Sequence, residues 1–400
     1  MESSIQASAL KLEHPGANRH PSLVHFALAV GGFAIGTTEF ATMSLVPDMA
    51  RDLGITEPAA GHVISAYALG VVVGAPLFAV LSARMAQRSV LILLMALFAL
   101  TNGLSAIAPN YHWMLLFRFA CGLPHGAYFG IAMLLAASLV PTNRRSAAVG
   151  RVILGLTVAT IVGVPLANWL GQSVGWRWAF AVVSGLSLLT AGLVALYAPR
   201  DKADSDASPL RELGALRNRD VWLTLLTGAI GFGGLFAVYT YLASTLAEVT
   251  GASPHALPFV LAAFGVGMTI GNLVVPRFAD RALMPTAGAL LLYAAVCLAL
   301  FAAAAHALWS ITLVMFMIGT SSALATVLQT RLMDVAGDGQ RLAAALNHSA
   351  FNTANALGPW LGGLAISAGY GWTSTGWVGV ALAIGGLLVW AWSGGIKLRR

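Results

Sequence analysis

The chain has 400 residues, of which 58% are hydrophobic and only 9% are charged, and its mean hydropathy is +0.80. A soluble domain carries about 25% charged residues, so this composition excludes a protein whose whole surface faces water and indicates an integral membrane protein. The net charge of +7 is typical of basic cytoplasmic loops, and we expect no nucleic-acid partner. The two cysteines, Cys121 and Cys297, lack metal-ligand spacing, and we expect no disulfide, metal or cofactor.

Apolar segments long enough to cross a bilayer recur along the whole chain, and each ends at Gly, Pro or charged residues. They predict an all-α membrane protein with twelve transmembrane helices in two pseudo-symmetric six-helix bundles. The first six predicted helices cover 25–47, 60–82, 89–108, 113–137, 146–170 and 177–198. The second six cover 221–247, 257–279, 284–304, 308–330, 342–366 and 374–395.

One long hydrophilic stretch, 199–220, separates the two sets and is predicted to be a linker. Nearly all Lys and Arg residues fall in the linker, the termini and the loops on the same side of this layout. The opposite side has only Arg51 and Arg177, so the linker and both termini are predicted to be cytoplasmic in a multi-pass inner (plasma) membrane protein. The predicted domains are a tail at 1–23, a bundle at 24–198, the linker, a bundle at 221–396 and a tail at 397–400.

The two halves carry an internal repeat. Segments 66–84 and 263–281 superpose without gaps, and 145–176 and 341–372 keep the same separation from an Arg to a Gly-Trp pair. The first alignment pairs Tyr67 with Phe264, Gly70 with Gly267, Gly74 with Gly271 and Arg84 with Arg281. We therefore expect duplicated units that together form one complete cavity, for which a monomer is the simpler expectation.

Several motifs in order resemble those of the major facilitator superfamily. The loop at 79–88 resembles the family's Gly-x3-Asp-Arg-x-Gly-x-Arg signature through Arg84 and Arg88, although Ala83 replaces the Asp; its repeat keeps Asp280 and Arg281. Arg118 with Gly122 fits the Arg-x3-Gly element that the family associates with proton handling. Gly155, Gly163 and Pro165 resemble the antiporter motif. The stretches 37–40, 45–56 and 118–130 resemble the drug- and sugar-efflux branch, near the arabinose-efflux-permease-like proteins.

This resemblance implies twelve helices of the major facilitator fold and a drug:proton antiporter type of activity. It also implies that Arg84, Arg88, Gly155, Gly163, Pro165, Asp280 and Arg281 serve conformational changes. The loop Asp helps to latch one conformation in the family, so Ala83 alters that role in the first half.

Glu39 is the one acid predicted to lie deep within a span. It lies eight residues before Pro47, hence roughly 12 Å below the outer end of its helix. A carboxylate in a membrane is costly unless it faces a cavity or a partner, so it indicates function by default. Arg118 enters from the same side at comparable depth, and the two groups are expected to meet. Proton coupling is one interpretation of Glu39, and a fixed ion-pair or hydrogen-bonding residue is the other.

Arg118, Gly122, His125 and Phe129 share one helix face at i, i+4, i+7 and i+11 spacing. We predict Glu39, Arg118 and His125 as proton-coupling residues. The alternatives are an Arg118 side chain that snorkels to the membrane surface and a His125 that only satisfies a hydrogen bond.

Other side chains are predicted to line a substrate cavity. His348, Asn352 and Asn355 form a polar stripe on one helix, for which contact between helices is an equal alternative. The aromatic candidates are Phe236 and Tyr239, with a lipid-facing position as the alternative. The complete set of predicted cavity residues is Thr38, Met43, Tyr67, Phe129, Phe236, Tyr239, His348, Asn352 and Asn355.

The sequence contains no Walker motif and no nucleophile motif, so we expect a secondary transporter and not an enzyme. The predicted function is proton-coupled efflux of a small drug-like compound or sugar-type metabolite by alternating access. The partners are the substrate, the proton and the lipid bilayer. A facilitator or a proton symporter that imports a metabolite is the nearest alternative, and a membrane ligand sensor that does not transport is an alternative of another class.

Overall fold

A computed structural model describes residues 21–82, 85–141, 145–200, 216–336 and 340–395. Within these ranges the regular structure is helical throughout, as the hydropathy pattern predicted. Eleven of the described helical segments are long and apolar enough to span a membrane. The remaining predicted span, 342–366, is α20 (Gln340–Ala365), a helix of 26 residues whose length corresponds to about 39 Å. Its His and Asn residues lower its mean hydropathy, but the helix is still long enough to span a bilayer. The predicted twelve-helix architecture is confirmed.

The first half contains six spans, several of them broken into consecutive segments at Gly or Pro. Span one is α2 (Pro21–Ser44), and the short helix α3 (Val46–Leu53) follows outside the span; span two is α4 (Glu57–Leu81), and span three is α5 (Gln87–Ala106). Span four is α6 (Tyr111–Gly122) with α7 (His125–Ser138). Span five is α8 (Arg145–Val158), η2 (Ala159–Gly163) and α9 (Val164–Val174), and span six is α10 (Trp176–Tyr197).

The second half repeats this order. Span seven is α12 (Arg219–Gly231), α13 (Gly233–Thr240) and α14 (Leu242–Glu248). Span eight is η4 (Pro254–Ala256), α15 (Leu257–Val274) and α16 (Pro276–Ala279), and span nine is α17 (Leu283–Ala304). Span ten is α18 (Leu308–Thr320), η5 (Ser321–Ala323) and α19 (Leu324–Val335). Span eleven is α20 with η7 (Ile366–Tyr370), and span twelve is α21 (Ser374–Trp390) with η8 (Ala391–Gly395).

Corresponding glycines make the same close helix contact in both halves. A Cβ atom added to Gly70 of α4 would lie 2.1 Å from the carbonyl oxygen of Phe119, and one added to Gly267 of α15 would lie 2.1 Å from that of Phe316. Small residues let helix backbones approach each other in this way. Because the two glycines are equivalent in the sequence repeat, α4 packs on α6 as α15 packs on α18.

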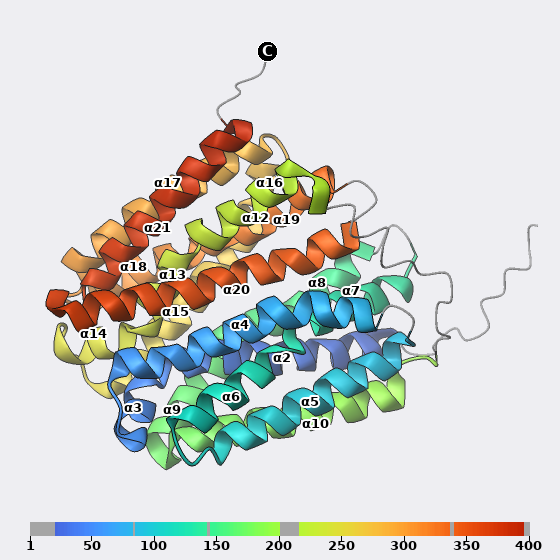
Figure 1. Cartoon of the computed structure of the whole chain (residues 1–400), viewed down its shortest axis with the longest axis horizontal. Coiled ribbons are helices and arrows are strands. Elements are labelled where there is room, and N and C mark those ends of the chain that lie inside the picture. The colour runs from blue at the N-terminus through green and yellow to red at the C-terminus, as the bar shows by residue number, and fades with distance from the viewer. Residues whose placement is uncertain (1–20, 83–84, 142–144, 201–215, 337–339, 396–400) are drawn as a thin grey trace, which may run out of the picture.

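The two halves meet mainly along α4 and α20, which run antiparallel through the middle of the molecule (Figure 1). We call the end of the bundle that carries Gly54 the Gly54 end, and the end from which the linker leaves the linker end. Among the described residues, hydrogen bonds between the halves lie at the Gly54 end and at mid-depth. These pairs are Glu57 with Ser244, Gln172 with Pro254, Ser65 with Ala356, Glu39 with Asn355 and Val72 with Ser349.

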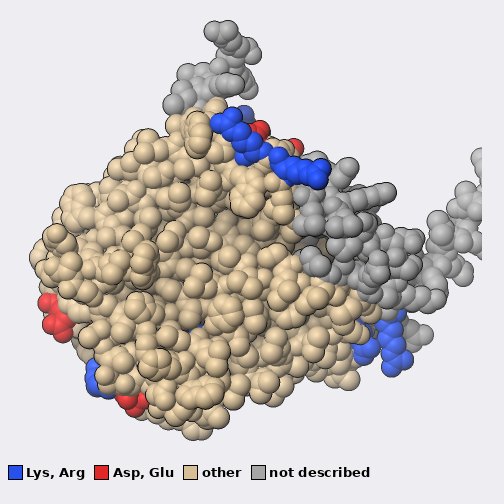
Figure 2. Space-filling model, in the orientation of Figure 1, with Lys and Arg blue, Asp and Glu red and all other residues tan. Residues whose placement is uncertain are grey.

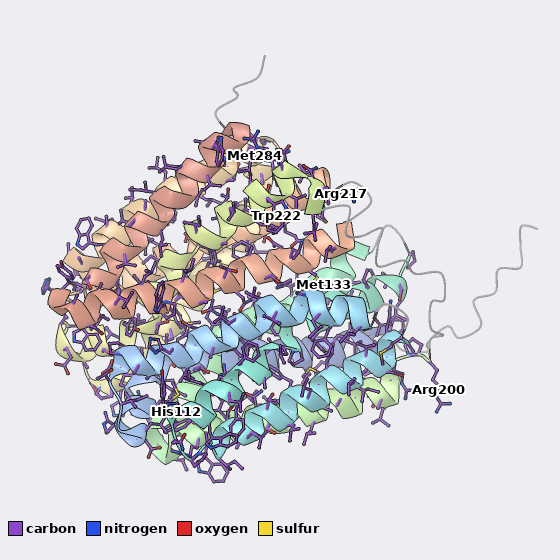
Figure 3. The ribbon with its side chains drawn as sticks, in the orientation of Figure 1. His112, Met133, Arg200, Arg217, Trp222 and Met284 are labelled. Atoms are coloured by element: carbon purple, nitrogen blue, oxygen red, sulfur yellow. The ribbon has the colours of Figure 1, made fainter. Side chains whose placement is uncertain are left out.

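Charged side chains avoid the middle of the visible surface. Figure 2 shows a broad face without charged side chains in its middle, and the Lys, Arg, Asp and Glu residues lie near the margins of this face. Arg200 and Arg217 lie at the linker end, whereas His112 lies at the Gly54 end (Figure 3). The uncharged zone corresponds to the apolar band that a lipid bilayer requires.

Candidate functional site

Glu39 lies at the interface between the two halves. Its helix, α2, is the most enclosed of the first half, and the Glu39 residue is only 8% exposed. The carboxylate Oε1 accepts a hydrogen bond of 3.2 Å from Nδ2 of Asn355 on α20. The deep acid of the first half is therefore joined directly to the polar stripe of the second half.

Arg118 is buried within the first half, with 1% exposure, and does not snorkel to the surface. Its Nη1 donates to the hydroxyl of Thr38 at 3.2 Å, and its guanidinium carbon lies 4.3 Å from the centre of the Tyr67 ring. The ring of Phe180 lies on the guanidinium at 5.2 Å. Nη1 also lies 3.7 Å from the Cys121 sulfur, a weak acceptor. These contacts hold the cation by a charge-assisted hydrogen bond to Thr38, a weaker one to sulfur and two aromatic faces.

The expected contact between Glu39 and Arg118 takes a different form. No ion pair joins them among the described residues, and the two charges interact electrostatically through space instead. The physical reason is helix phase: Arg118 reaches Thr38, whereas the next residue, Glu39, is turned about 100° away toward α20. The pair thus shares a neighbourhood but not a hydrogen bond.

Asn102 of α5 completes the surroundings of Arg118, and the sequence analysis did not include it. Its Oδ1 accepts from the Thr38 hydroxyl at 3.0 Å, and its Nδ2 donates to the Phe98 carbonyl at 2.8 Å and to the Cys121 sulfur at 3.1 Å. Asn102 is fully buried. The signal that would have found it is a lone amide within an apolar span, the same signal that marks residues of α20.

A second cluster lies nearer the linker end. Nδ1 of His125 lies 2.9 Å from the hydroxyl of Tyr67, and the His125 ring lies 6.2 Å from the ring of His348 on α20. His348 stacks on Phe129 with ring centres 5.6 Å apart and an interplanar angle of 4°. Two histidines, one from each half, therefore face each other at the interface.

The aromatic candidates of the second half also face inward. Phe236 and Tyr239 are 4% and 0% exposed, so neither faces lipid. They lie 6.4 Å and 5.6 Å from the ring of Phe40 on α2, and Phe264 of α15 joins them. Phe40 and Phe264 were not predicted, although Phe40 immediately follows Glu39. The cluster places an aromatic wall between the halves.

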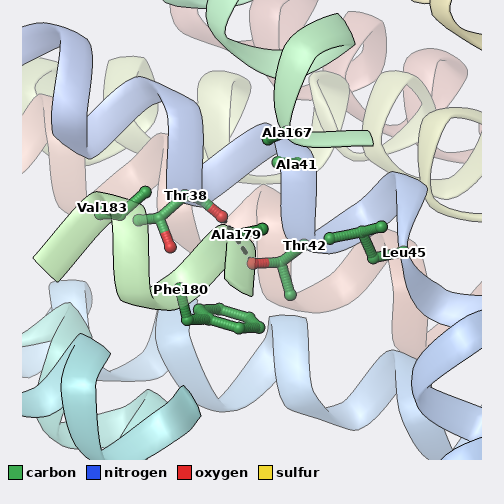
Figure 4. Close-up of a pocket in the computed structure, with 8 residues that line it drawn as sticks. All are labelled: Thr38, Ala41, Thr42, Leu45, Ala167, Ala179, Phe180 and Val183. Carbon is green, nitrogen blue, oxygen red and sulfur yellow. Dashed lines mark hydrogen bonds between the residues drawn. The ribbon is translucent and has the colours of Figure 1, made fainter. Parts of the chain in front are cut away.

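The remaining candidates lie in two settings. Met43 is buried in an apolar cluster near the Gly54 end of α2. Asn352, 4% exposed, donates from Nδ2 to the backbone carbonyl of His348 at 3.0 Å, while its Oδ1 has no partner. Beside Thr38 there is a cavity of about 10 Å³ within the first half, between α2, α9 and α10 (Figure 4). That volume suits a single water molecule and not an organic substrate.

The residues of the antiporter-like motif lie in span five, where it packs on α2. A Cβ atom on Gly155 would lie 2.0 Å from the Ala29 carbonyl oxygen, and one on Gly163 would lie 2.3 Å from the Thr37 hydroxyl, so both permit close packing of span five on α2. Pro165 stands at the start of α9, directly after the π-helical turn η2.

The loop residues of the motifs lie near the linker end. Arg88 donates to the Ala195 carbonyl, and Asp280 and Arg281 are exposed. Arg84 and Ala83 lie outside the described residues.

Two helical bundles that enclose buried charged and polar groups at their interface define a multi-pass membrane transporter. Residues 28–341 match the family model described as Major Facilitator Superfamily. The chain belongs to the major facilitator superfamily, and its members are transporters and not enzymes.

Relatives and solved structures agree with this assignment. The Inner membrane transport protein YdhP of Escherichia coli is 42% identical over 361 residues, which are 89% of this chain and 92% of that protein. The chloramphenicol resistance protein of Streptomyces lividans is 35% identical over 341 residues, covering 84% and 86%. A crystal structure of the nucleoside transporter NupG has a TM-score of 0.75 at 13% identity and covers 92% of this chain and 99% of that one. The protein is therefore an inner-membrane transporter with an efflux-type relative.

Proposed function

We propose that this protein expels a small organic molecule in exchange for protons, and that Glu39 carries the coupled proton. The observation that carries the proposal is the hydrogen bond from Asn355 to the Glu39 carboxylate across the two halves. A titratable group at a moving interface links its protonation to the relative position of the halves. The same site is where substrate enters in an alternating-access cycle.

Protonation of Glu39 changes the forces at the interface. The ionised carboxylate is favoured by the Asn355 amide and by the nearby positive charge of Arg118. Protonation removes the negative charge, which weakens both attractions and frees the two halves to separate at this level. Loss of the proton on the other side of the membrane restores the contact and resets the cycle.

The direction of transport rests on the orientation predicted from Lys and Arg. We propose that the linker end is cytoplasmic and that the Gly54 end faces outward. Glu57 and Ser244 then close the outward side, together with the contact between Gln172 and Pro254. A proton that enters the cell under a potential of 100 mV supplies about 2.3 kcal/mol before any pH difference is added. That energy drives expulsion of the substrate.

The substrate is proposed to be a drug-like compound or a sugar-type metabolite. The efflux-type relatives support this class, among them one named for chloramphenicol resistance and one named a probable sugar efflux transporter. We propose that the substrate binds between the halves at the cluster in which His125 contacts Tyr67, Phe129 and His348.

The test is transport in proteoliposomes with an imposed pH gradient, comparing wild type with Glu39→Gln. We expect Glu39→Gln to lose uphill, pH-driven transport while it retains exchange of labelled for unlabelled substrate. Glu248→Gln is the matched control, because it makes the same chemical change at an exposed acid near the Gly54 end. Full pH-driven transport by Glu39→Gln refutes coupling through this residue and favours a facilitator.

A further inference from the structure

We infer that the interface selects solutes that combine an aromatic ring with at least two hydrogen-bond donors, and that the side-chain oxygens of Asn352 and Asn355 receive those donors. This inference rests on the proposed transport function and specifies the substrate class. It assigns substrate recognition to the side-chain oxygens of Asn352 and Asn355, whereas the proposed proton coupling uses only the Nδ2 group of Asn355.

The orientation of each amide follows from its partner. Nδ2 of Asn352 lies 3.0 Å from the His348 carbonyl oxygen, and Nδ2 of Asn355 lies 3.2 Å from a carboxylate oxygen of Glu39. Both partners are acceptors, so each amide must present its NH₂ group to them. Among the described residues each side chain has this one hydrogen-bond partner, and its amide oxygen is turned away from it.

Both oxygens are buried and unpaired. Asn352 is 4% exposed and Asn355 is 0% exposed, and the Oδ1 atoms of both have no hydrogen-bond partner in the described structure. Most buried polar groups in proteins are hydrogen-bonded, because an unpaired acceptor loses its water without replacement. Two unpaired acceptors at i and i+3 on one helix face therefore form a pair that a ligand with two donors satisfies.

An aromatic wall stands beside these acceptors. A Cβ atom added to Gly358, one turn beyond Asn355, would lie 3.0 Å from Cβ of Phe236. Phe236 and Tyr239 belong to the aromatic cluster that contains Phe40, and the Tyr239 hydroxyl is buried without a partner. The cluster draws its rings from both halves, so a ligand ring inserted there contacts both halves at once.

The charges of the site favour neutral or cationic solutes over anions. The Glu39 carboxylate faces α20, whereas the Arg118 guanidinium is held in the first half by Thr38 and Tyr67. A ligand anion placed at the amide oxygens would meet the oxygens of Asn352, Asn355 and Glu39, and the unpaired Tyr239 hydroxyl of the neighbouring aromatic cluster is a neutral donor that supplies no positive charge. The fitting class is thus an uncharged or basic aromatic compound with hydroxyl or N–H groups.

The experiment measures equilibrium binding to the purified full chain in detergent, with two matched pairs of probes. One pair is chloramphenicol and its diacetate, and the other is phenyl glucoside and its acetylated form; acetylation keeps the ring and blocks the hydroxyl donors. Wild type is expected to bind at least one parent compound about tenfold or more tightly than its ester, since a hydrogen bond of ordinary strength corresponds to about a tenfold change.

Asn352→Leu and Asn355→Leu are expected to reduce this preference to about threefold or less, with little change in ester binding. The comparison of parent with ester on wild type needs no variant and keeps the test valid if a variant fails to fold. Equal binding of parent and ester, no binding of either parent, or an unchanged preference in both folded variants overturns the inference.

Proton release measured in the same titrations separates this inference from the proposed function. A preference for the parent without proton release supports the recognition site and contradicts coupling through Glu39. Proton release without any preference for the parent supports coupling and overturns the recognition site.

Discussion

Thr38 connects Arg118 to the rest of the first half, and its hydroxyl is the most informative group to remove. It accepts from Arg118 at 3.2 Å and donates to Asn102 at 3.0 Å. Thr38→Val keeps the shape of the side chain and deletes both hydrogen bonds. We expect this variant to fold less stably and to respond to a different pH range in transport, because the Arg118 charge near Glu39 is no longer held.

The magnitude follows from the two lost bonds. A hydrogen bond to a charged group contributes about 1.5–3 kcal/mol and one between neutral groups about 1 kcal/mol. Thr38 is 3% exposed, so bulk water does not reach the hydroxyl, and the Cys121 sulfur, 3.7 Å from Nη1 of Arg118, is only a weak acceptor. The expected loss in the free energy of unfolding is therefore about 2.5–4 kcal/mol.

The assay is unfolding by titration with a denaturing detergent, followed by tryptophan fluorescence. Thr38→Ser is the matched control: it keeps the hydroxyl and removes one methyl group, for which we expect about 1 kcal/mol. If Thr38→Val loses no more than Thr38→Ser, the hydroxyl does not position Arg118 and the reasoning is wrong.

Three further predictions concern packing, closure and pH. Gly122→Ala should abolish correct folding, since its Cβ atom would lie 2.0 Å from the Tyr67 carbonyl oxygen, whereas Gly130→Ala, with no atom within 4 Å, should retain a wild-type chromatography profile. A Cβ atom on Gly61 would lie 2.5 Å from the Tyr241 hydroxyl, so Gly61→Val should displace Tyr241. We expect increased labelling of cysteines introduced at the Gly54 end. Unchanged labelling would show that the contact between Gly61 and Tyr241 does not close the Gly54 end. Burial raises the pKa of Asp48, which lies outside the membrane-spanning helices, although the arginine one turn on lowers it. The contribution of Asp48 to stability is thus greatest below the ordinary Asp pKa of about 3.9 and is lost as the pH rises through the raised pKa. Asp48→Asn should therefore flatten the pH dependence of unfolding, and an unaltered profile would contradict this.

The sequence by itself determined the architecture. An apolar segment of spanning length must form a helix in lipid, because its backbone polar groups find no other partners there. Hydropathy therefore predicted twelve spans without reference to their packing. The repeat was equally readable, and the matching contacts of Gly70 and Gly267 show that these positions need small residues in both halves for the same steric reason. Glu39 was identifiable as well, because a solitary acid in an apolar helix is costly wherever it points.

Only the tertiary structure decided which groups meet. Depth along a helix placed Glu39 and Arg118 at one level, but the direction of each side chain depends on helix rotation and on neighbours far away in sequence. Asn355, separated from Glu39 by 316 positions, takes the carboxylate, while Thr38 and Asn102 hold the arginine. The unpaired oxygens of Asn352 and Asn355 likewise became visible only once their NH₂ partners were known. Periodicity specifies which residues share a helix face, whereas the packing of the two halves specifies what that face meets.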